Sequence, residues 1–213
     1  MTSTIGGEGK TFTAMNVASI FALLNKKVVL VGVDLRKPRI FEDFGLDNKI
    51  GLVDYLVGDV GNVNDIIQST EYKNLSVVSS GPIPPNPSEL LQGENFVVAL
   101  DELKKEFDVV ILDTPPIGLV ADALDIAPYS DLFLFIVRSG YSDRRQLNLL
   151  KGKVAKGLLK NVHIIINDAS RASGGYGYGY GYGYGYGYGY GYGYGYGYGY
   201  GYYEDDSKGL KRF

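Results

Sequence analysis

Six residues near the start of the chain combine glycines with a lysine and a hydroxyl group. They are Gly6, Gly7, Glu8, Gly9, Lys10 and Thr11. Glycines let successive backbone N–H groups curl round phosphate oxygens, the lysine ammonium can reach β- and γ-phosphates, and the threonine hydroxyl can bind Mg²⁺. This order of residues predicts a P-loop, so all six are candidates for nucleotide contact.

Two aspartates follow runs of apolar residues. Asp113 closes one run and precedes Thr-Pro-Pro, and Asp34 closes another. A carboxylate at the tip of a strand can hold Mg²⁺ or its water, and parallel strands bring their carboxyl ends to one edge of a sheet. We therefore predict that Thr11 and Asp113 form a magnesium site beside the P-loop and that Asp34 lies at the same edge of the sheet. The cations that follow Asp34 either meet phosphate or acidic partners or form a solvated loop: Arg36, Lys37 and Arg39.

The elements that must position these residues alternate between two patterns. Short apolar runs without polar alternation predict strands covered on both faces, at residues 28–34, 75–79, 108–113, 131–138 and 162–167. Between them, helical patterns occupy residues 11–24, 51–56, 63–69, 87–106 and 143–159. This alternation predicts an α/β fold of the P-loop NTPase type, a mostly parallel sheet with helices on both faces.

Composition narrows the classes of partner. The 213 residues carry 21 Lys and Arg against 24 Asp and Glu, a formal net charge of −3. No basic field results, so nucleic acid is excluded from the expected partners. The chain has no cysteine, which excludes disulfides and thiolate metal sites and fits a reducing compartment.

The C-terminal part of the chain has a different amino-acid composition. Residues 174–203 consist only of Gly and Tyr, and residues 204–213 are polar and charged. We therefore divide the chain into a domain of residues 1–173, a Gly-Tyr tail and a charged C-terminus. Glycine between tyrosines removes steric barriers, so the tail can enter a groove in any register. The candidate phosphoacceptors are Tyr176, Tyr178, Tyr180, Tyr182, Tyr184, Tyr186, Tyr188, Tyr190, Tyr192, Tyr194, Tyr196, Tyr198, Tyr200, Tyr202 and Tyr203. The alternative is a low-complexity segment that associates through aromatic contacts.

Together these motifs resemble the bacterial tyrosine kinases that control capsule and exopolysaccharide export, in the ParA/MinD-like branch of P-loop proteins. The resemblance spans residues 2–203 and rests on residues 3–11, 33–38, 81–91 and 112–116 and on the tyrosine-rich end. Its most specific parts are the Pro-Asn-Pro-Ser-Glu-Leu-Leu stretch and the tail.

The resemblance implies roles for single residues. Lys10 would bind the phosphates of ATP, Thr11 and Asp34 would serve Mg²⁺, Asp113 would complete the site, and the tail would be autophosphorylated. Asn167 would read the base, or else serves as a turn residue at a strand end. The family's proposed base for the tyrosine is an aspartate at the position that Gly32 occupies here. That departure leaves Lys10 and Asp34 as the predicted catalytic residues.

The resemblance also implies partners and a location. Such kinases work at the cytoplasmic face of the cell membrane, coupled to a transmembrane polysaccharide co-polymerase segment or protein, and the tail would support self-association. Only three residues precede the P-loop, fewer than a typical strand has. The sequence thus predicts that the strand feeding the loop is missing, and that the chain is part of a longer membrane-linked kinase or starts at a misassigned Met.

Two other functions compete with the kinase. One is a ParA/MinD-like ATPase whose nucleotide state switches its association with a partner. The other is a non-catalytic interaction module in which the tail is the working part. A partitioning ATPase has no evident need for fifteen tyrosines, which favours the kinase.

Overall fold

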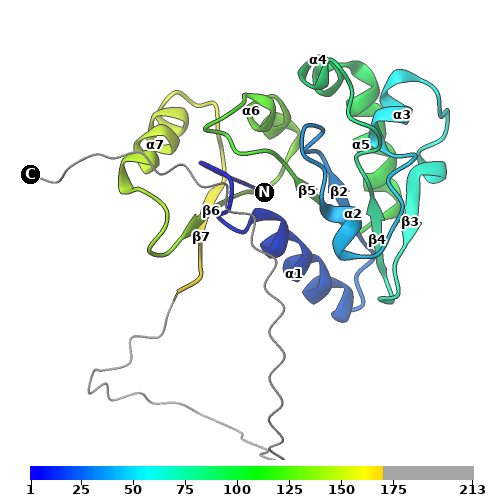
Figure 1. Cartoon of the computed structure of the whole chain (residues 1–213), viewed down its shortest axis with the longest axis horizontal. Coiled ribbons are helices and arrows are strands. Elements are labelled where there is room, and N and C mark those ends of the chain that lie inside the picture. The colour runs from blue at the N-terminus through cyan, green and yellow to red at the C-terminus, as the bar shows by residue number, and fades with distance from the viewer. Residues whose placement is uncertain (170–213) are drawn as a thin grey trace, which may run out of the picture. The chain divides into compact units, whose positions relative to one another are not determined.

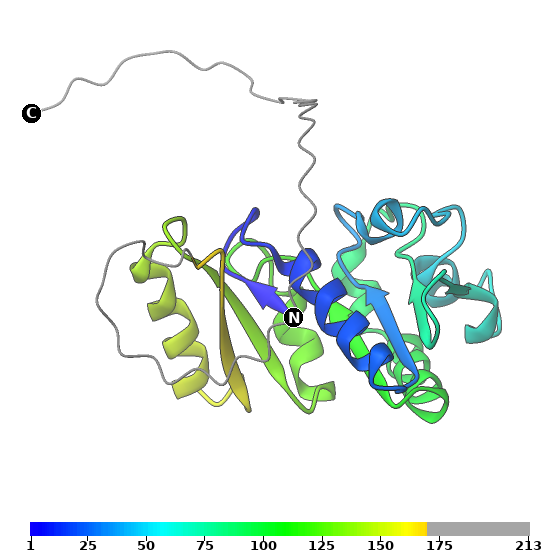
Figure 2. The same ribbon diagram turned by 90° about the horizontal axis from the view of Figure 1, so that it is seen from below.

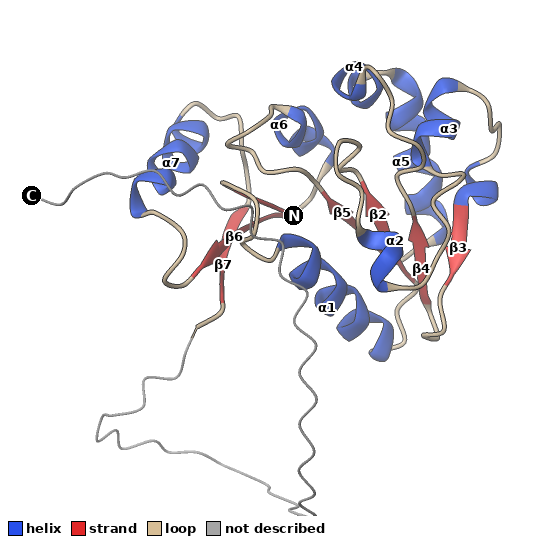
Figure 3. Cartoon of the chain, viewed as in Figure 1, coloured by secondary structure: helices blue, strands red, loops and turns tan. Residues whose placement is uncertain are grey.

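The computed structural model describes residues 1–169 of the chain. Two groups of mostly parallel strands form its centre. One has the order β3 (Ile67–Ser69), β4 (Leu75–Val78), β2 (Val28–Gly32), β5 (Val109–Asp113), and the other the order β1 (Thr2–Ser3), β6 (Phe133–Arg138), β7 (Val162–Asn167). Every pairing is parallel except that of β3 with β4. The predicted parallel α/β architecture is confirmed (Figures 1 and 3).

The helices lie on both faces of these strands. On one face α1 (Lys10–Leu23) covers β2, as Figure 2 also shows from below, and on the other lie α3 (Leu52–Val57), α4 (Pro87–Gln92) and α5 (Glu94–Glu106). The remaining short helices are α2 (Ile40–Asp43), α6 (Asp122–Ile126) and α7 (Leu147–Ala155), with the 3-10 turns η1 (Val63–Ile66), η2 (Ala127–Tyr129) and η3 (Arg144–Gln146).

Strand β2 shows why both faces need cover. All five of its residues are buried. Val28 and Leu30 pack into the cluster that contains the alanines of α1, whereas Val29 and Val31 pack with Phe96 of α5. Successive strand side chains point to opposite faces, so a continuous apolar run fills two cores at once. This double burial fixes the position of β2 and therefore of the residues after it.

Three predicted helices differ from the structure. Residues 63–69 form only the single turn η1, capped by the Asn62 side chain, before the chain pairs as the antiparallel edge strand β3. The helix expected over 87–106 is split at Gly93, whose backbone is extended at φ −70° and ψ 155°. The last helix is η3 followed by α7 and ends at Ala155, because Gly157 turns the chain at φ +70°.

The strand ahead of the P-loop was predicted to be missing, and that prediction is corrected in part. Thr2 and Ser3 form β1, which pairs with Phe135 and Ile136 of β6. Met1 extends the contact to β5, because its nitrogen donates to the Leu112 carbonyl at 2.6 Å.

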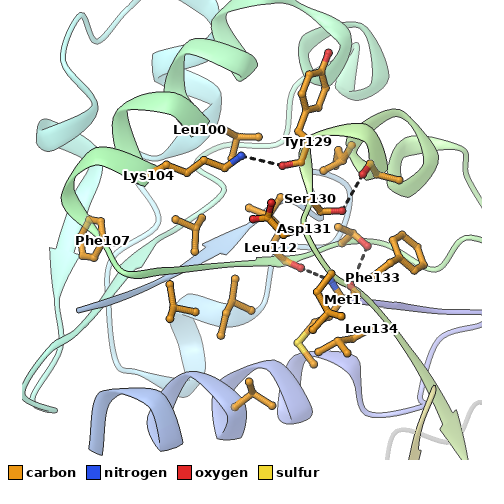
Figure 4. A pocket seen from close by; sticks show the side chains of 18 of the residues that line it. Met1, Leu100, Lys104, Phe107, Leu112, Tyr129, Ser130, Asp131, Phe133 and Leu134 are labelled. Atoms are coloured by element: carbon orange, nitrogen blue, oxygen red, sulfur yellow. Dashed lines mark hydrogen bonds between the residues drawn. The ribbon is translucent and has the colours of Figure 1, made fainter. Parts of the chain in front are cut away.

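Below β1 the two groups of strands are separated by an apolar cavity, which we call the strand slot. It has a volume of about 350 Å³ and lies between β5 and β6, with α1 and α5 on its sides (Figure 4). Its walls include Leu112, Phe133 and Leu134. Within residues 1–169, β5 pairs as a strand only with β2, and β6 meets β1 only at Phe135 and Ile136. The facing edges of β5 and β6 along the slot therefore have no strand between them.

Candidate nucleotide site

The carboxyl ends of β1, β2 and β5 open into one cavity of about 530 Å³. That size lies within the usual range for small-molecule sites. The predicted residues that line it are Gly6, Gly7, Gly9, Lys10, Thr11, Asp34 and Asp113, together with Gly32. The structure thus brings the P-loop and both aspartates to one place. Two further residues that the sequence predicts to bind the nucleotide, Glu8 and Asn167, are not part of this lining.

The P-loop turns directly into α1. Gly9 is the N-cap of that helix and has φ +86°, a left-handed conformation that favours glycine. A Cβ atom at Gly9 would lie 2.1 Å from the Asn167 side-chain nitrogen, so space as well as φ requires glycine. The exposed N–H groups and the helix dipole make this helix N-terminus a favourable place for phosphate, with Lys10 as its first residue.

Thr11 and Asp113 form a corner suited to a metal ion. The Thr11 hydroxyl donates to Asp113 Oδ2 at 2.6 Å. Asp113 Oδ1 is buried and has no hydrogen-bond partner among the described residues. Burial raises the pKa of Asp113, although the Thr11 hydrogen bond acts in the opposite direction. A hydroxyl and a carboxylate are hard oxygen ligands, so these residues fit Mg²⁺.

Asp34 stands across the cavity at the end of β2. Its Oδ1 accepts hydrogen bonds from the backbone nitrogens of Arg36 at 3.2 Å and Lys37 at 3.0 Å. These bonds hold the carboxylate at the start of the following turn, where it is half-buried. Burial is the main cause that raises the pKa of Asp113, and the negative charge of Asp34 adds a smaller effect in the same direction.

Gly32 lines the same cavity, but a neighbour occupies the space beside it. A Cβ atom at Gly32 would lie 2.9 Å from Ser80 Oγ. The Ser80 hydroxyl is buried and donates to the Gly32 carbonyl at 2.7 Å. The Ser80 hydroxyl therefore crowds the position from which an aspartate side chain would extend. Glycine, which departs from the family pattern here, avoids this contact.

Arg36 joins three segments around the cavity. Its Nε donates to Asp122 Oδ2 at 3.2 Å and its Nη2 to Ser88 Oγ at 2.8 Å. Ser88 in turn donates to Asp122 Oδ1 at 2.7 Å, and the Asp122 side chain is almost fully buried. Of the two interpretations for this cation, the structure favours an acidic partner within the chain. Arg36 fixes the loop after β2 to the starts of α4 and α6.

Glu8 and Asn167 lie behind the P-loop. Glu8 is completely buried, and its carboxylate accepts from the Ile5 backbone nitrogen at 2.9 Å and from the Ser142 hydroxyl. Asn167, the last residue of β7, donates to the Glu8 carbonyl at 3.0 Å. Both side chains therefore hold the shape of the loop. The base-reading role of Asn167 stays a prediction.

Sequence reasoning missed two side chains that grip the loop from outside. Arg138 Nη1 donates to the Gly7 carbonyl at 3.0 Å, and the Tyr141 hydroxyl donates to the Gly6 carbonyl at 3.1 Å. The Arg138 guanidinium carbon lies 5.2 Å from the centre of the Tyr141 ring. We call this pair the carbonyl clamp. Its residues and the glycines that they contact are more than 130 residues apart in the sequence, so no local sequence pattern predicts it.

The predicted phosphoacceptors, from Tyr176 to Tyr203, lie outside the described residues. The division of the chain at residues 173 and 203 therefore stays a prediction. No helix within residues 1–169 is long and apolar enough to cross a membrane.

A P-loop feeding a helix, with carboxylates at two neighbouring strand tips, defines a P-loop nucleotide-binding protein. The AAA domain family matches residues 1–129. The tyrosine-protein kinase YwqD of Bacillus subtilis (strain 168) is 38% identical over 167 residues, covering 78% of this chain and 70% of that protein. The chain belongs to the bacterial tyrosine-protein kinases and is an enzyme of that class.

Two further relatives agree in fold and sequence. The tyrosine-protein kinase ptk of Acinetobacter johnsonii is 39% identical over 168 residues, which are 79% of this chain but only 23% of that longer protein. The kinase domain of the Escherichia coli tyrosine kinase ETK superposes with a TM-score of 0.76 at 31% identity, covering 85% of this chain and 71% of that chain. The family resemblance found in the sequence is thereby confirmed.

Proposed function

We propose that this chain transfers the γ-phosphoryl group of ATP to the tyrosines of its own segment 174–203 and so regulates the polymerisation and export of capsule or exopolysaccharide. The observation that carries the proposal is the corner at Asp113. Its buried carboxylate has one oxygen, Oδ1, with no hydrogen-bond partner within residues 1–169, while the other, Oδ2, accepts from the Thr11 hydroxyl at the start of the P-loop helix. That arrangement is costly in an apoprotein and is relieved by a bound cation.

The residues of the site divide the work between them. Lys10 and the N–H groups at the start of α1 bind phosphate oxygens and stabilise the charge that spreads over the transferring group. Thr11 and Asp113 hold Mg²⁺, which when bound neutralises phosphate charge. Asp34 lies across the cavity, where it orients the tyrosine hydroxyl and accepts its proton, because Gly32 has no carboxylate to offer.

The tail supports the proposal through its charge as well as its composition. Each phosphotyrosine adds about −1.5 to −2 charges at neutral pH. A tail of fifteen tyrosines can therefore carry far more negative charge than the rest of the chain, whose formal total is −3. Such a change would alter self-association through the tail and contact with a transmembrane co-polymerase segment or protein at the inner face of the cell membrane.

Autophosphorylation is tested with the purified chain, ATP and Mg²⁺. Trypsin releases residues 172–208, which hold all fifteen tail tyrosines, because no Lys or Arg lies between Arg171 and Lys208. We expect Lys10→Ala to lower the rate of tail phosphorylation by at least about 100-fold, since it removes a cation that stabilises the transferring phosphate. Lys151→Ala, a change at an exposed lysine of α7, is the matched control and should keep the rate.

Each outcome assigns the function. Undiminished phosphotyrosine in Lys10→Ala would overturn the assignment of the site. ATP hydrolysis without phosphotyrosine in the unmodified chain would favour the ATPase switch. An absence of both ATP binding and phosphotyrosine would favour the interaction module.

A further inference from the structure

Tyr141 touches the outer face of the P-loop while remaining open to solvent. Its hydroxyl donates to the Gly6 carbonyl at 3.1 Å, and it lies 3.0 Å from the position of a Cβ atom on Gly7. Half of the residue, 50%, is exposed. Tyr141 is not part of the lining of the nucleotide cavity, and its hydroxyl contacts the loop through the Gly6 carbonyl, outside that cavity.

The sequence around Tyr141 matches the tail. Fourteen of the fifteen tail tyrosines follow a glycine, and Tyr141 follows Gly140. The other three tyrosines of the chain, Tyr55, Tyr72 and Tyr129, follow Asp, Glu and Pro, respectively. Gly140 has φ +71°, so it lies in a turn, between β6 and η3. The residue therefore combines the local sequence of the expected acceptors with an exposed position in a loop.

We propose that Tyr141 is a further phosphoacceptor, modified by a second copy of the chain, and that its phosphate loosens the P-loop. The inference rests on the proposed kinase function. Tyr141 Oη attacks the γ-phosphorus of ATP, the bond between that phosphorus and the β,γ-bridging oxygen breaks, and ADP leaves. The phenolic proton passes to a carboxylate of the modifying copy, for which Asp34 is placed. Transfer occurs between copies because the hydroxyl lies outside the nucleotide cavity of its own chain, bonded to the Gly6 carbonyl.

A phosphate at Tyr141 would undo the carbonyl clamp. The hydroxyl that donates to the Gly6 carbonyl is lost, and a dianion takes its place beside that oxygen. Arg138 is the nearby cation, and it now donates to the Gly7 carbonyl at 3.0 Å and to Asp168 Oδ2 at 3.0 Å. Arginine prefers phosphate as a bidentate partner, so it is drawn away from Gly7.

The loss reaches the nucleotide through the backbone. The carbonyls of Gly6 and Gly7 set the peptide planes whose N–H groups face the phosphate site. Releasing both hydrogen bonds lowers nucleotide affinity by about 10-fold, which is the scale of one or two net hydrogen bonds. Phosphorylation at Tyr141 is thus a brake on the same site that phosphorylates the tail.

The experiment uses two full-length copies that differ in isotope. The acceptor is the Lys10→Ala chain grown in ¹⁵N medium, and the enzyme is the unlabelled chain with ATP and Mg²⁺. Trypsin cuts after Arg138 and Arg144, so residues 139–144 form a peptide with Tyr141 as its single tyrosine. Tyr72 is the matched control because its exposure, 51%, is nearly equal and its preceding residue is Glu71.

We expect the ¹⁵N peptide 139–144 to gain one phosphoryl group while Tyr72 stays unmodified. Binding of a fluorescent ADP analogue should then weaken by about 10-fold in the phosphorylated chain, and by much less in phosphorylated Tyr141→Phe, each compared with its own unphosphorylated form. A phosphorylated tail with an unmodified 139–144 peptide would refute the inference and leave the kinase function standing. Equal labelling of Tyr72, or unchanged ADP binding, would also refute it. An unmodified tail would instead refute the proposed function itself.

Discussion

An apolar strand appended ahead of Met1 should fill the strand slot. The change is an extension such as Val-Ile-Val-Ile joined directly to Met1, after a new initiating residue. Met1 already bonds as a parallel strand does, because its nitrogen donates to the Leu112 carbonyl and its own carbonyl accepts from the Thr114 nitrogen at 3.2 Å. The pairing of Thr2 with Phe135 sets the register on the other side, so the residue before Met1 would face Phe133.

The size of the effect follows from the volume of the slot. Filling about 350 Å³ of apolar cavity contributes at most about 8 kcal/mol at the usual cost per unit of cavity volume. Ordering four added residues costs about 6 kcal/mol. A net gain of about 2 kcal/mol remains, which corresponds to a rise in Tm of about 4–8 °C for a domain of this size.

Circular dichroism measures the unfolding, because the chain has no tryptophan to report it by fluorescence. The control is a Ser-Gly-Ser-Gly extension of equal length. Hydrogen exchange gives a second measurement, since the amides of Val110 and Leu112 lie on the same edge of β5 as that of Thr114 and should become protected only by the apolar extension. Equal Tm values and equal exchange for the two extensions would refute the assignment of the slot as a strand position.

Three further predictions concern Asp113, Gly32 and Asp34. Asp113→Asn should lower tail phosphorylation by at least about 100-fold; without Mg²⁺ its Tm should not fall below that of the unmodified chain at pH 7. Burial raises the pKa of Asp113, so the unmodified chain loses stability as pH rises from the unfolded-state value of about 4 through the folded-state value, and the amide removes this loss. If Tm falls by the same amount between pH 4 and pH 7 in the unmodified chain and in Asp113→Asn, the ionisation of Asp113 is not the cause of the loss. Gly32→Asp should lose about 1–3 kcal/mol of stability to overpacking against Ser80. Adding Ser80→Ala should recover part of this loss, with Ser80→Ala alone as the control. An unchanged Tm in Gly32→Asp would show that the Ser80 side chain moves aside without cost. Asp34→Asn should reduce the rate of tail phosphorylation more than the double variant Gly32→Asp/Ser80→Ala does.

The parts of the site that the sequence predicts are those encoded by short segments. Glycine, lysine and threonine in a fixed order specify the P-loop, and an apolar strand ending in aspartate places Asp34 and Asp113 at one edge of the sheet. The break at Gly93 could also have been predicted, because a glycine within a long helical pattern disfavours its continuation. Strand β3 could not, since its three residues are too few to show a period and its pairing with β4 determines it.

The supports of the site depend on contacts between distant segments. Ser142 reaches Glu8, and Arg36 reaches Asp122, each across a long stretch of sequence. Charged and hydroxyl residues in loops have many possible partners, and only the fold selects among them. For Glu8 the motif predicts nucleotide contact, and this stays a prediction for its backbone N–H group, because its side chain is buried against Ile5 and Ser142.

The P-loop is held between two groups of strands with different tasks. Asp113 ends β5 and Asp34 follows β2, and both complete the site. The carbonyl clamp lies at the end of β6 and in the turn after it, and Asn167 ends β7. Nucleotide affinity therefore depends on the spacing of the two groups, and the strand slot lies between them. An apolar strand in the slot should tighten ADP binding as well as raise Tm, and a phosphate on Tyr141 should weaken ADP binding at unchanged slot geometry. The two perturbations act on opposite supports of one loop, so their effects on nucleotide affinity should add.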